Sequence, residues 1–338
     1  MSRSSRTLRS SRAFLVRTLL TALAVTAAAV GPAAAQPMPA ADPIPAARKL
    51  ATPNMRAFGV NDWSCRPGSG HPRPLVLVHG TLESGQMWKK AAPVYKAAGY
   101  CVFALDYGRT GGALSLVAGG VGRVADSAKQ LGVFVEGVLA ATGAGQVDVV
   151  GHSQGGMMPR QYMKFEGGAK KVHTLVGISP SNHGTRSEFL DSLFKDDWGL
   201  AALLAPIAAL LPTGDILDLP CPACTDQMAG SKFLTRLGEG GDTLPGVTYQ
   251  VIASKYDTVV TPPREQFLQG DKVSNVYLQD VCPDNRSGHQ RTATDPLATR
   301  IALNALDPAH AVKPSCLGPL GSLLTSVLGL PSALLGLG

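Results

Sequence analysis

Six short apolar runs divide the chain between residues 74 and 278, and each is continuous rather than alternating. Runs of four to seven apolar residues are typical of strands that are buried on both faces of a sheet. The six predicted strands are Pro74–Val78, Cys101–Leu105, Val147–Val150, Val172–Ile178, Val247–Ala253 and, with a weaker pattern, Asn275–Leu278.

Segments with hydrophobic residues at helical spacing lie between these runs, most clearly at Met87–Ala98, Val121–Ala141 and Gly155–Phe165. Alternation of strands and helices favours a mostly parallel sheet that is covered by helices on both sides. The sequence has no internal repeat and no clear linker. We therefore expect one α/β domain over residues 58–316.

An insertion at about residues 185–245 interrupts the alternation. Its apolar residues share one helical face between Leu200 and Leu211, although Pro206 interrupts that pattern. An insertion at this point would lie above the strand ends, where ligands bind in such sheets. We expect a lid or cap, and the alternative is a buried core helix. The side chains expected to face a bound substrate are Leu203, Leu204 and Ile207.

The first 35 residues have the pattern of a secretory signal peptide. Arginines at the start precede the uncharged apolar stretch Leu19–Val30, and Ala33-Ala34-Ala35 offers a cleavage site. We expect cleavage near Ala35 and secretion of the mature chain. A membrane anchor is the alternative, but the apolar stretch is shorter than the about 20 residues that a membrane span needs.

Two further segments lie outside the predicted domain. Residues 36–57 are rich in proline and alanine, and we expect an N-terminal arm without a core of its own. Residues 317–338 form an uncharged apolar tail that several glycines and prolines interrupt. We expect this tail to pack on the domain surface, and contact with a membrane or a substrate aggregate is the alternative.

The net charge of +7 does not indicate a nucleic-acid partner. Residues 1–35 contain five arginines and no acidic residue, so their removal leaves a charge of +2. The basic character is thus mostly a property of the predicted signal peptide.

All six cysteines follow residue 35, and an even number in an exported chain favours disulfides. The CxxC spacing of Cys221 and Cys224 would also suit a redox motif or half of a zinc site. No second CxxC and no nearby histidine supports zinc, and we expect Pro222 in a loop rather than at a helix start. Local position favours the pairs Cys65–Cys101, Cys221–Cys224 and Cys282–Cys316.

The strongest chemical signal is Gly151-His152-Ser153-Gln154-Gly155, which follows the third apolar run and precedes a helical segment. A serine between two such glycines in a strand–turn–helix context is typical of a nucleophile elbow, whose tight turn excludes side chains at the glycine positions. The N-terminus of the following helix favours developing negative charge. The pattern predicts Ser153 as a nucleophile.

A nucleophilic serine needs a base and an acid that orients the base, and this fold places them after the serine in the order acid, then histidine. His289 lies in a loop after the last predicted strand, and His310 is a weaker alternative. Asp257 follows the fifth run directly, whereas Asp280 and Asp284 come at and after the last strand. We therefore expect Asp257 and His289 to complete a triad.

The oxyanion of an acyl-transfer reaction needs preorganised N–H donors. We expect them from the backbones of Gln154 and of Thr81, which lies in the loop after the first strand, and the Thr81 hydroxyl could add a third donor. Leu82 and His152 are expected to contact the substrate. No HExxH motif and no dense acidic loop indicates a metal, and the serine mechanism needs no cofactor.

The residues above resemble those of the small secreted lipases of actinobacteria, and more distantly those of the fungal lipase B type. The matching features are His79-Gly80-Thr81, the Cys65–Cys101 placement, the GHSQGG sequence from Gly151, and the loops at Asp257 and His289. The resemblance covers residues 58–316. It implies an α/β-hydrolase fold, cleavage of acylglycerols or simple carboxylic esters, and an oxyanion hole formed by Thr81 and Gln154.

The expected function is therefore that of a secreted serine lipase or carboxylesterase acting through an acyl-enzyme. The expected partner is an ester or lipid substrate, with contact at lipid–water interfaces, and the expected oligomeric state is a monomer. An acyltransferase, a thioesterase or a polyester hydrolase could use the same triad, because a fold does not fix a substrate. A secreted binding protein without catalysis is a more remote alternative.

Overall fold

The computed structural model describes residues 42–110, 118–186 and 221–316. Within these ranges six strands form one sheet in the order β2-β1-β3-β4-β5-β6, and every neighbouring pair is parallel. The parallel α/β arrangement predicted from the sequence is thus confirmed. The strands are β1 (Leu75–Val78), β2 (Val102–Leu105), β3 (Val147–His152), β4 (Val172–Ile178), β5 (Thr248–Ala253) and β6 (Val273–Tyr277).

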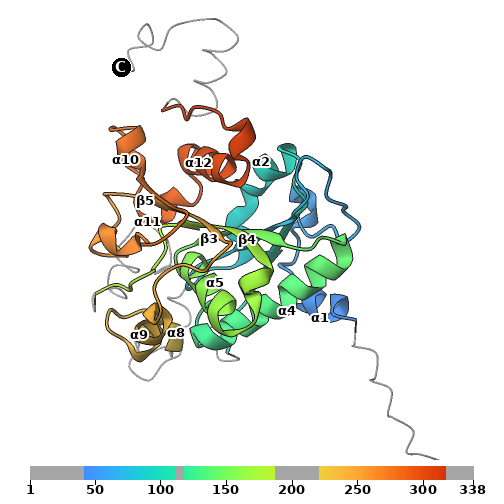
Figure 1. The fold of residues 1–338 in the computed structure, drawn as a ribbon, viewed down its shortest axis with the longest axis horizontal. Helices are drawn as coiled ribbons and strands as arrows, with labels where there is room; N and C mark the ends of the chain where they lie inside the picture. The colour runs from blue at the N-terminus through green and yellow to red at the C-terminus, as the bar shows by residue number, and fades with distance from the viewer. Residues whose placement is uncertain (1–41, 111–117, 187–220, 317–338) are drawn as a thin grey trace, which may run out of the picture. The chain divides into compact units, whose positions relative to one another are not determined.

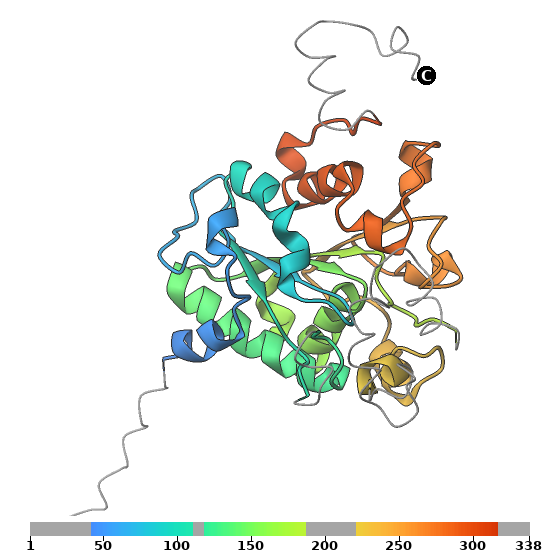
Figure 2. The same ribbon diagram turned by 180° about the vertical axis from the view of Figure 1, so that it is seen from behind.

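Helices cover both faces of the sheet: α2 and α12 lie on one side, and α1, α4 and α5 on the other (Figure 1). Figure 2 shows the same two layers from behind. The helices are α1 (Ile44–Leu50), α2 (Ala92–Ala97), α4 (Val124–Thr142), α5 (Gln154–Phe165), α8 (Pro222–Asp226), α9 (Lys232–Gly238), α10 (Leu278–Val281), α11 (His289–Thr292) and α12 (Pro296–Leu306). The 3-10 segments are η1 (Arg56–Phe58), η2 (Gly85–Lys89), η3 (Gly168–Lys170), η5 (Pro263–Gln266) and η6 (Pro308–His310).

The two helical layers explain why the strand sequences are mostly apolar. Alternate residues of β1 point to opposite faces, so Leu75 and Leu77 join the core that contains Trp88 of η2, while Val76 and Val78 join the core beneath α4. β6 is one of the two edge strands, and its side chains are half-buried or exposed, whereas the other edge strand, β2, is buried beside residues 51–60. This exposure accounts for the weak apolar pattern of β6.

The strand order creates the place for a site. The chain runs from β1 outward to β2 and then returns to β3 on the other side of β1. The loops that follow β1 and β3 therefore leave the sheet in opposite directions, and ligands bind in the crevice at such a switch point. Val78 pairs with Gly151 in the register of these strands, so the segments that follow them, from His79 and from His152, lie side by side.

Three expectations for individual elements differ from the structure. The helix expected at Met87–Ala98 is divided into η2 and α2, and Pro93 lies in the first turn of α2, where its missing N–H does not interrupt a helical bond. Pro222 was expected in a loop, but it is the first residue of α8, a position that proline favours. The sixth strand begins at Val273 rather than at residue 275.

Part of the proline- and alanine-rich arm packs on the domain. Residues 44–50 form α1, and Ala47 of this helix is completely buried against α4. The close approach requires Gly137 of α4, because a Cβ at that position would overlap Ala47. The predicted signal peptide (1–35), the lid residues Leu203, Leu204 and Ile207, and the tail (317–338) lie outside the described residues.

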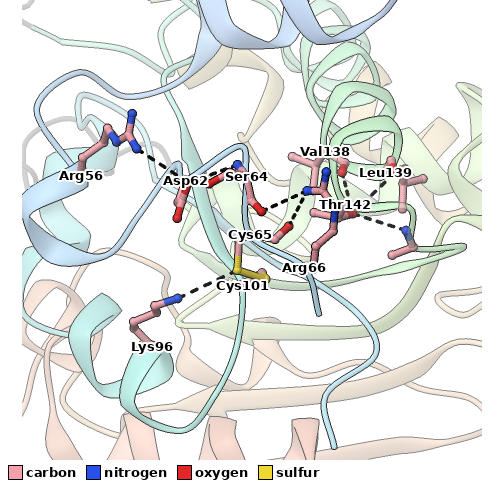
Figure 3. Close-up of a disulfide and its surroundings, with 11 residues drawn as sticks. Arg56, Asp62, Ser64, Cys65, Arg66, Lys96, Cys101, Val138, Leu139 and Thr142 are labelled. Atoms are coloured by element: carbon pink, nitrogen blue, oxygen red, sulfur yellow. Dashed lines mark hydrogen bonds and ion pairs between the residues drawn. A yellow bond between two sulfur atoms is a disulfide. The ribbon is translucent and has the colours of Figure 1, made fainter. Parts of the chain in front are cut away.

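The structure contains three disulfides, Cys65–Cys101, Cys221–Cys224 and Cys282–Cys316, which are the pairs that local position favours. The first joins the segment before β1 to the residue before β2, and Lys96 lies beside its sulfur atoms (Figure 3). Bridges of this kind persist in oxidising compartments. Across the described ranges, no helix is long and apolar enough to span a membrane.

Arg160, His183 and Asp242 form a charge cluster that connects the loop before β5 to α5 and to the loop after β4. Arg160 of α5 is 1% exposed, and its Nη2 lies 2.7 Å from Oδ1 of Asp242. Nε2 of His183 lies 3.1 Å from the same oxygen, and Arg160 also donates to the carbonyl of Asn182. Burial alone would raise the pKa of Asp242, but the His183 hydrogen bond and the Arg160 charge outweigh it and lower that pKa to about 2.

Asp242→Asn is expected to lower the free energy of unfolding by about 2 kcal/mol at pH 7. Because the pKa of Asp242 is lower in the folded state than its ordinary 3.8, the carboxylate stabilises the fold above about pH 4. This contribution disappears as the pH falls through 2. In urea titrations of both proteins between pH 7 and pH 2.5, the difference in unfolding free energy should therefore shrink towards acid pH. Asp126→Asn, at an exposed ion pair of α4, is the control and should change little.

Candidate active site

Ser153 occupies the turn between β3 and α5 in a strained backbone conformation, with φ 54° and ψ −123°. Residues other than glycine rarely adopt a positive φ, and such backbone strain is found mostly at functional sites. The turn depends on its glycines, because a Cβ at Gly151 would overlap the Gly155 carbonyl and a Cβ at Gly155 would overlap the His79 carbonyl. The sequence pattern therefore holds Ser153 at the carboxyl end of β3, facing the loop after β1.

Asp257 and His289 meet although 32 residues separate them. Asp257 lies in the loop after β5, His289 is the first residue of α11, and both side chains are buried. The distance from His289 Nδ1 to Asp257 Oδ2 is 2.8 Å. The two residues predicted to act together are therefore in direct contact.

The other partners of Asp257 fix its orientation. Oδ1 accepts the backbone N–H groups of Val259 and Val260, each at 2.9 Å, and Oδ2 also accepts from Gln266 Nε2 at 2.9 Å. All of these neighbours donate, so Asp257 is an ionised acceptor and the proton of His289 lies on Nδ1. Nε2 of His289 then keeps a lone pair, and this buried atom has no hydrogen-bond partner among the described residues.

Thr81 and Gln154 lie together across the switch point. Gln154 is the first residue of α5, and its Nε2 donates to Thr81 Oγ1 at 2.8 Å and to the Gly120 carbonyl at 2.8 Å. In the described part of the chain, no acceptor pairs with the backbone N–H of either Thr81 or Gln154. These two N–H groups are thus available to a ligand oxygen beside Ser153.

The hydroxyl of Thr81 has an additional partner that the sequence did not reveal. Gln227 of the segment after α8 donates from Nε2 to Thr81 Oγ1 at 2.8 Å, while its own oxygen accepts from Ser181. Oγ1 therefore accepts two hydrogen bonds, from Gln227 and from Gln154. Its single proton is left to donate, and the described residues offer it no acceptor.

Glu83 and His152 form a buried pair beside Ser153. Glu83 Oε2 lies 3.2 Å from His152 Nδ1 and also accepts the Gly80 N–H. The other ring nitrogen of His152, Nε2, lies 3.0 Å from the carbonyl oxygen of His289. Burial alone would lower the pKa of His152, but the Glu83 carboxylate raises it, and the charge of His152 in turn keeps the pKa of Glu83 below its usual range.

The residues predicted to contact substrate, and the weaker candidates for the acid and the base, have other surroundings. His152 was expected to touch substrate, but its ring is 0% exposed, and its two nitrogens face Glu83 and the His289 carbonyl instead. Leu82 is almost completely buried, at a positive φ of 62°, in the loop after β1. The weaker alternatives are apart from this cluster: His310 is exposed beside Asp307, and Asp280 pairs with Lys255.

Glu83, Gln227 and Gln266 are site residues that the sequence analysis missed. Gln227 is 146 residues from Thr81, and Glu83 is 69 residues from His152. Such contacts have no local sequence pattern. One signal was present for Glu83, because it is an acidic residue directly after an apolar strand and an HGT turn, where a carboxylate needs a partner once it is buried.

Comparison with known proteins places this geometry in a family. The profile described as Lipase (class 2) matches residues 72–302, a range that includes Thr81, Ser153, Asp257 and His289. The comparison with curated proteins found no match.

Among solved structures, the chain is similar to Aspergillus fumigatus lipase B, with 22% identity and a TM-score of 0.55. The match covers 78% of this chain and 57% of the fungal chain, so this chain spans little more than half the length of that relative. A Bacillus licheniformis lipase in its mature form is 16% identical with a TM-score of 0.49, and the match covers 72% of this chain and 94% of that one.

The structural likeness shows the fold, which is that of the α/β-hydrolases. The profile match extends over more than half of the sequence and includes the strand–turn–helix around Ser153. The chain therefore belongs to the class 2 lipase family, whose members are hydrolases of the lipase and esterase type.

Proposed function

We propose that the protein is a serine ester hydrolase in which Ser153 is the nucleophile, His289 the general base and Asp257 the residue that orients the base. The observation that carries this proposal is the state of His289. Asp257 fixes its proton on Nδ1, and Nε2 is left as a buried acceptor without a partner among the described residues. A serine at a strained elbow is a weak nucleophile without such a base.

The reaction follows from these positions. His289 Nε2 takes the hydroxyl proton as Ser153 Oγ attacks the ester carbonyl, and Asp257 stabilises the imidazolium that forms. His289 then gives the proton to the departing alcohol, which leaves an acyl group on Ser153. A water molecule activated in the same way by His289 releases the acid and restores the serine.

Three donors support the tetrahedral intermediate in this proposal. They are the backbone N–H groups of Thr81 and Gln154 and the hydroxyl of Thr81, whose proton is directed by the two amides that occupy its oxygen. The donors are preorganised, so they need no rearrangement as the negative charge develops.

For the substrate we propose acylglycerols and other carboxylic esters with apolar acyl chains. Membership of the class 2 lipase family and the uncharged sequence from Gly199 to Gly214 support this choice. We also propose that the mature chain is secreted after cleavage near Ala35. The N-terminal sequence pattern and the three disulfides support secretion.

The test is covalent labelling together with a substrate panel. A fluorophosphonate probe should label the wild-type protein at Ser153, identified by peptide mass, and the protein should hydrolyse p-nitrophenyl esters over a series of chain lengths. Emulsified triglyceride, an acyl thioester and a polyester film separate a lipase from a thioesterase and a polyester hydrolase. A wild-type protein that neither labels nor hydrolyses any ester would show that the proposed function is wrong.

Thr81→Val is expected to lower kcat for p-nitrophenyl butyrate by about 100-fold, the usual effect of losing one oxyanion donor. The valine keeps the shape of the side chain but leaves the Gln154 and Gln227 amides without their shared acceptor. Thr81→Ser is the matched control, since it retains the hydroxyl, and its kcat should remain within a few-fold of wild type. Equal losses in both variants would contradict a role for the hydroxyl.

A further inference from the structure

A buried hydrogen-bonded chain joins three loops around the nucleophile. Glu83 in the loop after β1 accepts from Gly80 and contacts His152, the last residue of β3. His152 reaches on to the backbone carbonyl of His289 at the start of α11. The side chains of Glu83 and His152 are 7% and 0% exposed, so this series of hydrogen bonds is shielded from water.

The partners of His152 determine its charge. Both atoms that face its ring nitrogens, a carboxylate oxygen and a carbonyl oxygen, are acceptors. A neutral imidazole carries only one N–H, so it could satisfy only one of these atoms, whereas an imidazolium satisfies both. The ion pair with Glu83 leaves no uncompensated charge in the interior.

His79 is an internal comparison, because it is equally buried and lies in the same loop system. One of its nitrogens faces the Gly80 carbonyl at 2.8 Å, and the other faces the Tyr107 backbone N–H at 3.3 Å. One acceptor and one donor suit a neutral ring, and burial accordingly lowers the pKa of His79. Two buried histidines near the same site are thus assigned opposite charge states by their partners.

We propose that His152 is an imidazolium at neutral pH and that the Glu83–His152 ion pair positions the Thr81 loop and His289 relative to Ser153. The inference rests on the proposed function, since it assigns both as positioning residues for that reaction. Each contact of this pair is adjacent to a group of the proposed reaction. Glu83 accepts from Gly80, the residue before Thr81, and His152 immediately precedes Ser153. The carbonyl that His152 contacts belongs to His289, which supplies the base. A small misplacement of reacting groups can lower a rate by about 100-fold.

Loss of the Glu83 charge should neutralise His152. The ionisable groups facing His152 are Glu83, Asp257 in the loop after β5 and His289 of α11, whose ring centroid lies 4.9 Å from that of His152. Of these, Glu83 contributes most to raising the pKa of His152, and burial acts against it. In Glu83→Gln, burial dominates and the ring becomes neutral. If the glutamine oxygen stays where Oε2 accepts the Gly80 N–H, the ring proton lies on Nδ1 and the hydrogen bond to the His289 carbonyl is lost.

The kinetic test compares Glu83→Gln with wild type per active site, counted by titration with a fluorophosphonate. We expect kcat for p-nitrophenyl butyrate to fall by about 10- to 100-fold while KM changes by less than about threefold. Wild-type kcat should also fall at alkaline pH in a step that reflects deprotonation of His152. This step should be missing from Glu83→Gln, in which the ring is already neutral.

Asp148→Asn is the matched control. Asp148 is also a buried carboxylate that contacts a histidine, His173, and it pairs with Arg73, but it lies at the other end of β3. Its loss should lower stability and leave kcat per active site and the alkaline step unchanged. If Glu83→Gln behaves like Asp148→Asn, the Glu83–His152 pair is only structural and the proposal is overturned.

A measurement on the wild type keeps the proposal testable if Glu83→Gln does not fold. In protein labelled with ¹⁵N-histidine, His152 should show two protonated ring nitrogens at pH 7, and His79 should show one. A single protonated nitrogen on His152 would overturn the charge assignment. Failure of the proposed function would look different, because the wild type would then lack labelling and ester hydrolysis whatever the state of His152.

Discussion

Ser153→Ala is expected to abolish labelling by a fluorophosphonate and to lower kcat/KM for p-nitrophenyl butyrate by about 10⁶-fold. The substitution removes the hydroxyl oxygen that forms the acyl-enzyme in the proposed mechanism. It leaves the oxyanion donors in place, so a rate of about 10³–10⁴ times that of the uncatalysed reaction should remain. Alanine should adopt the same backbone conformation, because Ser153 is held there by backbone bonds to Ile178 and Gly156 rather than by its hydroxyl.

The control for this variant is Ser127→Ala. Ser127 is a buried serine of α4 whose hydroxyl, like that of Ser153, forms no hydrogen bond among the described residues. Its replacement should leave labelling and kcat/KM unchanged. Persistent stoichiometric labelling in Ser153→Ala would mean that the reactive serine lies elsewhere, and the assignment of the elbow as the reactive centre would then be wrong.

Most of the fold was predictable because the pattern of apolar residues in the sequence reflects which side chains are buried. A parallel strand covered on both faces is mostly apolar, and the residues of β1 to β5 are almost all buried. The boundaries that moved have local causes. Pro93 begins a new helix within the segment expected to be continuous, and β6 is an edge strand with exposed side chains. The packing of α1 on α4 depends on Gly137, and a single glycine inside a helix does not reveal its partner.

The candidate site was predictable to the extent that chain order and turn chemistry fix it. Ser153, Asp257 and His289 follow the order that this fold imposes: Ser153 follows β3, Asp257 lies in the loop after β5, and His289 begins α11. The residues that orient them were not predictable. Gln266 and Gln227 act through side-chain hydrogen bonds whose partners are set by the folding of distant loops. The role of His152 changed for the same reason, because its contact with Glu83 exists only after β1 and β3 pair.

Asp257→Asn is expected to lower kcat by about 10⁴-fold, because the carboxylate determines which nitrogen of His289 carries the proton. The side-chain oxygen of the asparagine must stay at the Oδ1 position, since the N–H groups of Val259 and Val260 both need an acceptor there. Its NH₂ group is then forced to the Oδ2 position, where it faces His289 Nδ1. A donor at that position requires an unprotonated Nδ1, which puts the histidine proton on Nε2.

His289 in that tautomer cannot accept the proton of Ser153, so the loss arises from the base and not from substrate binding. We therefore expect KM to change little while kcat falls, and titration with a slow fluorophosphonate should show a lower rate of labelling at full final stoichiometry. Asp280→Asn is the matched control, because Asp280 is a nearby exposed acid that pairs with Lys255 and does not contact His289. If the two variants retained equal kcat, Asp257 would not be the orienting acid. A loss of kcat confined to Asp257→Asn, with KM unchanged, would instead support Asp257 as the residue that sets the tautomer of His289.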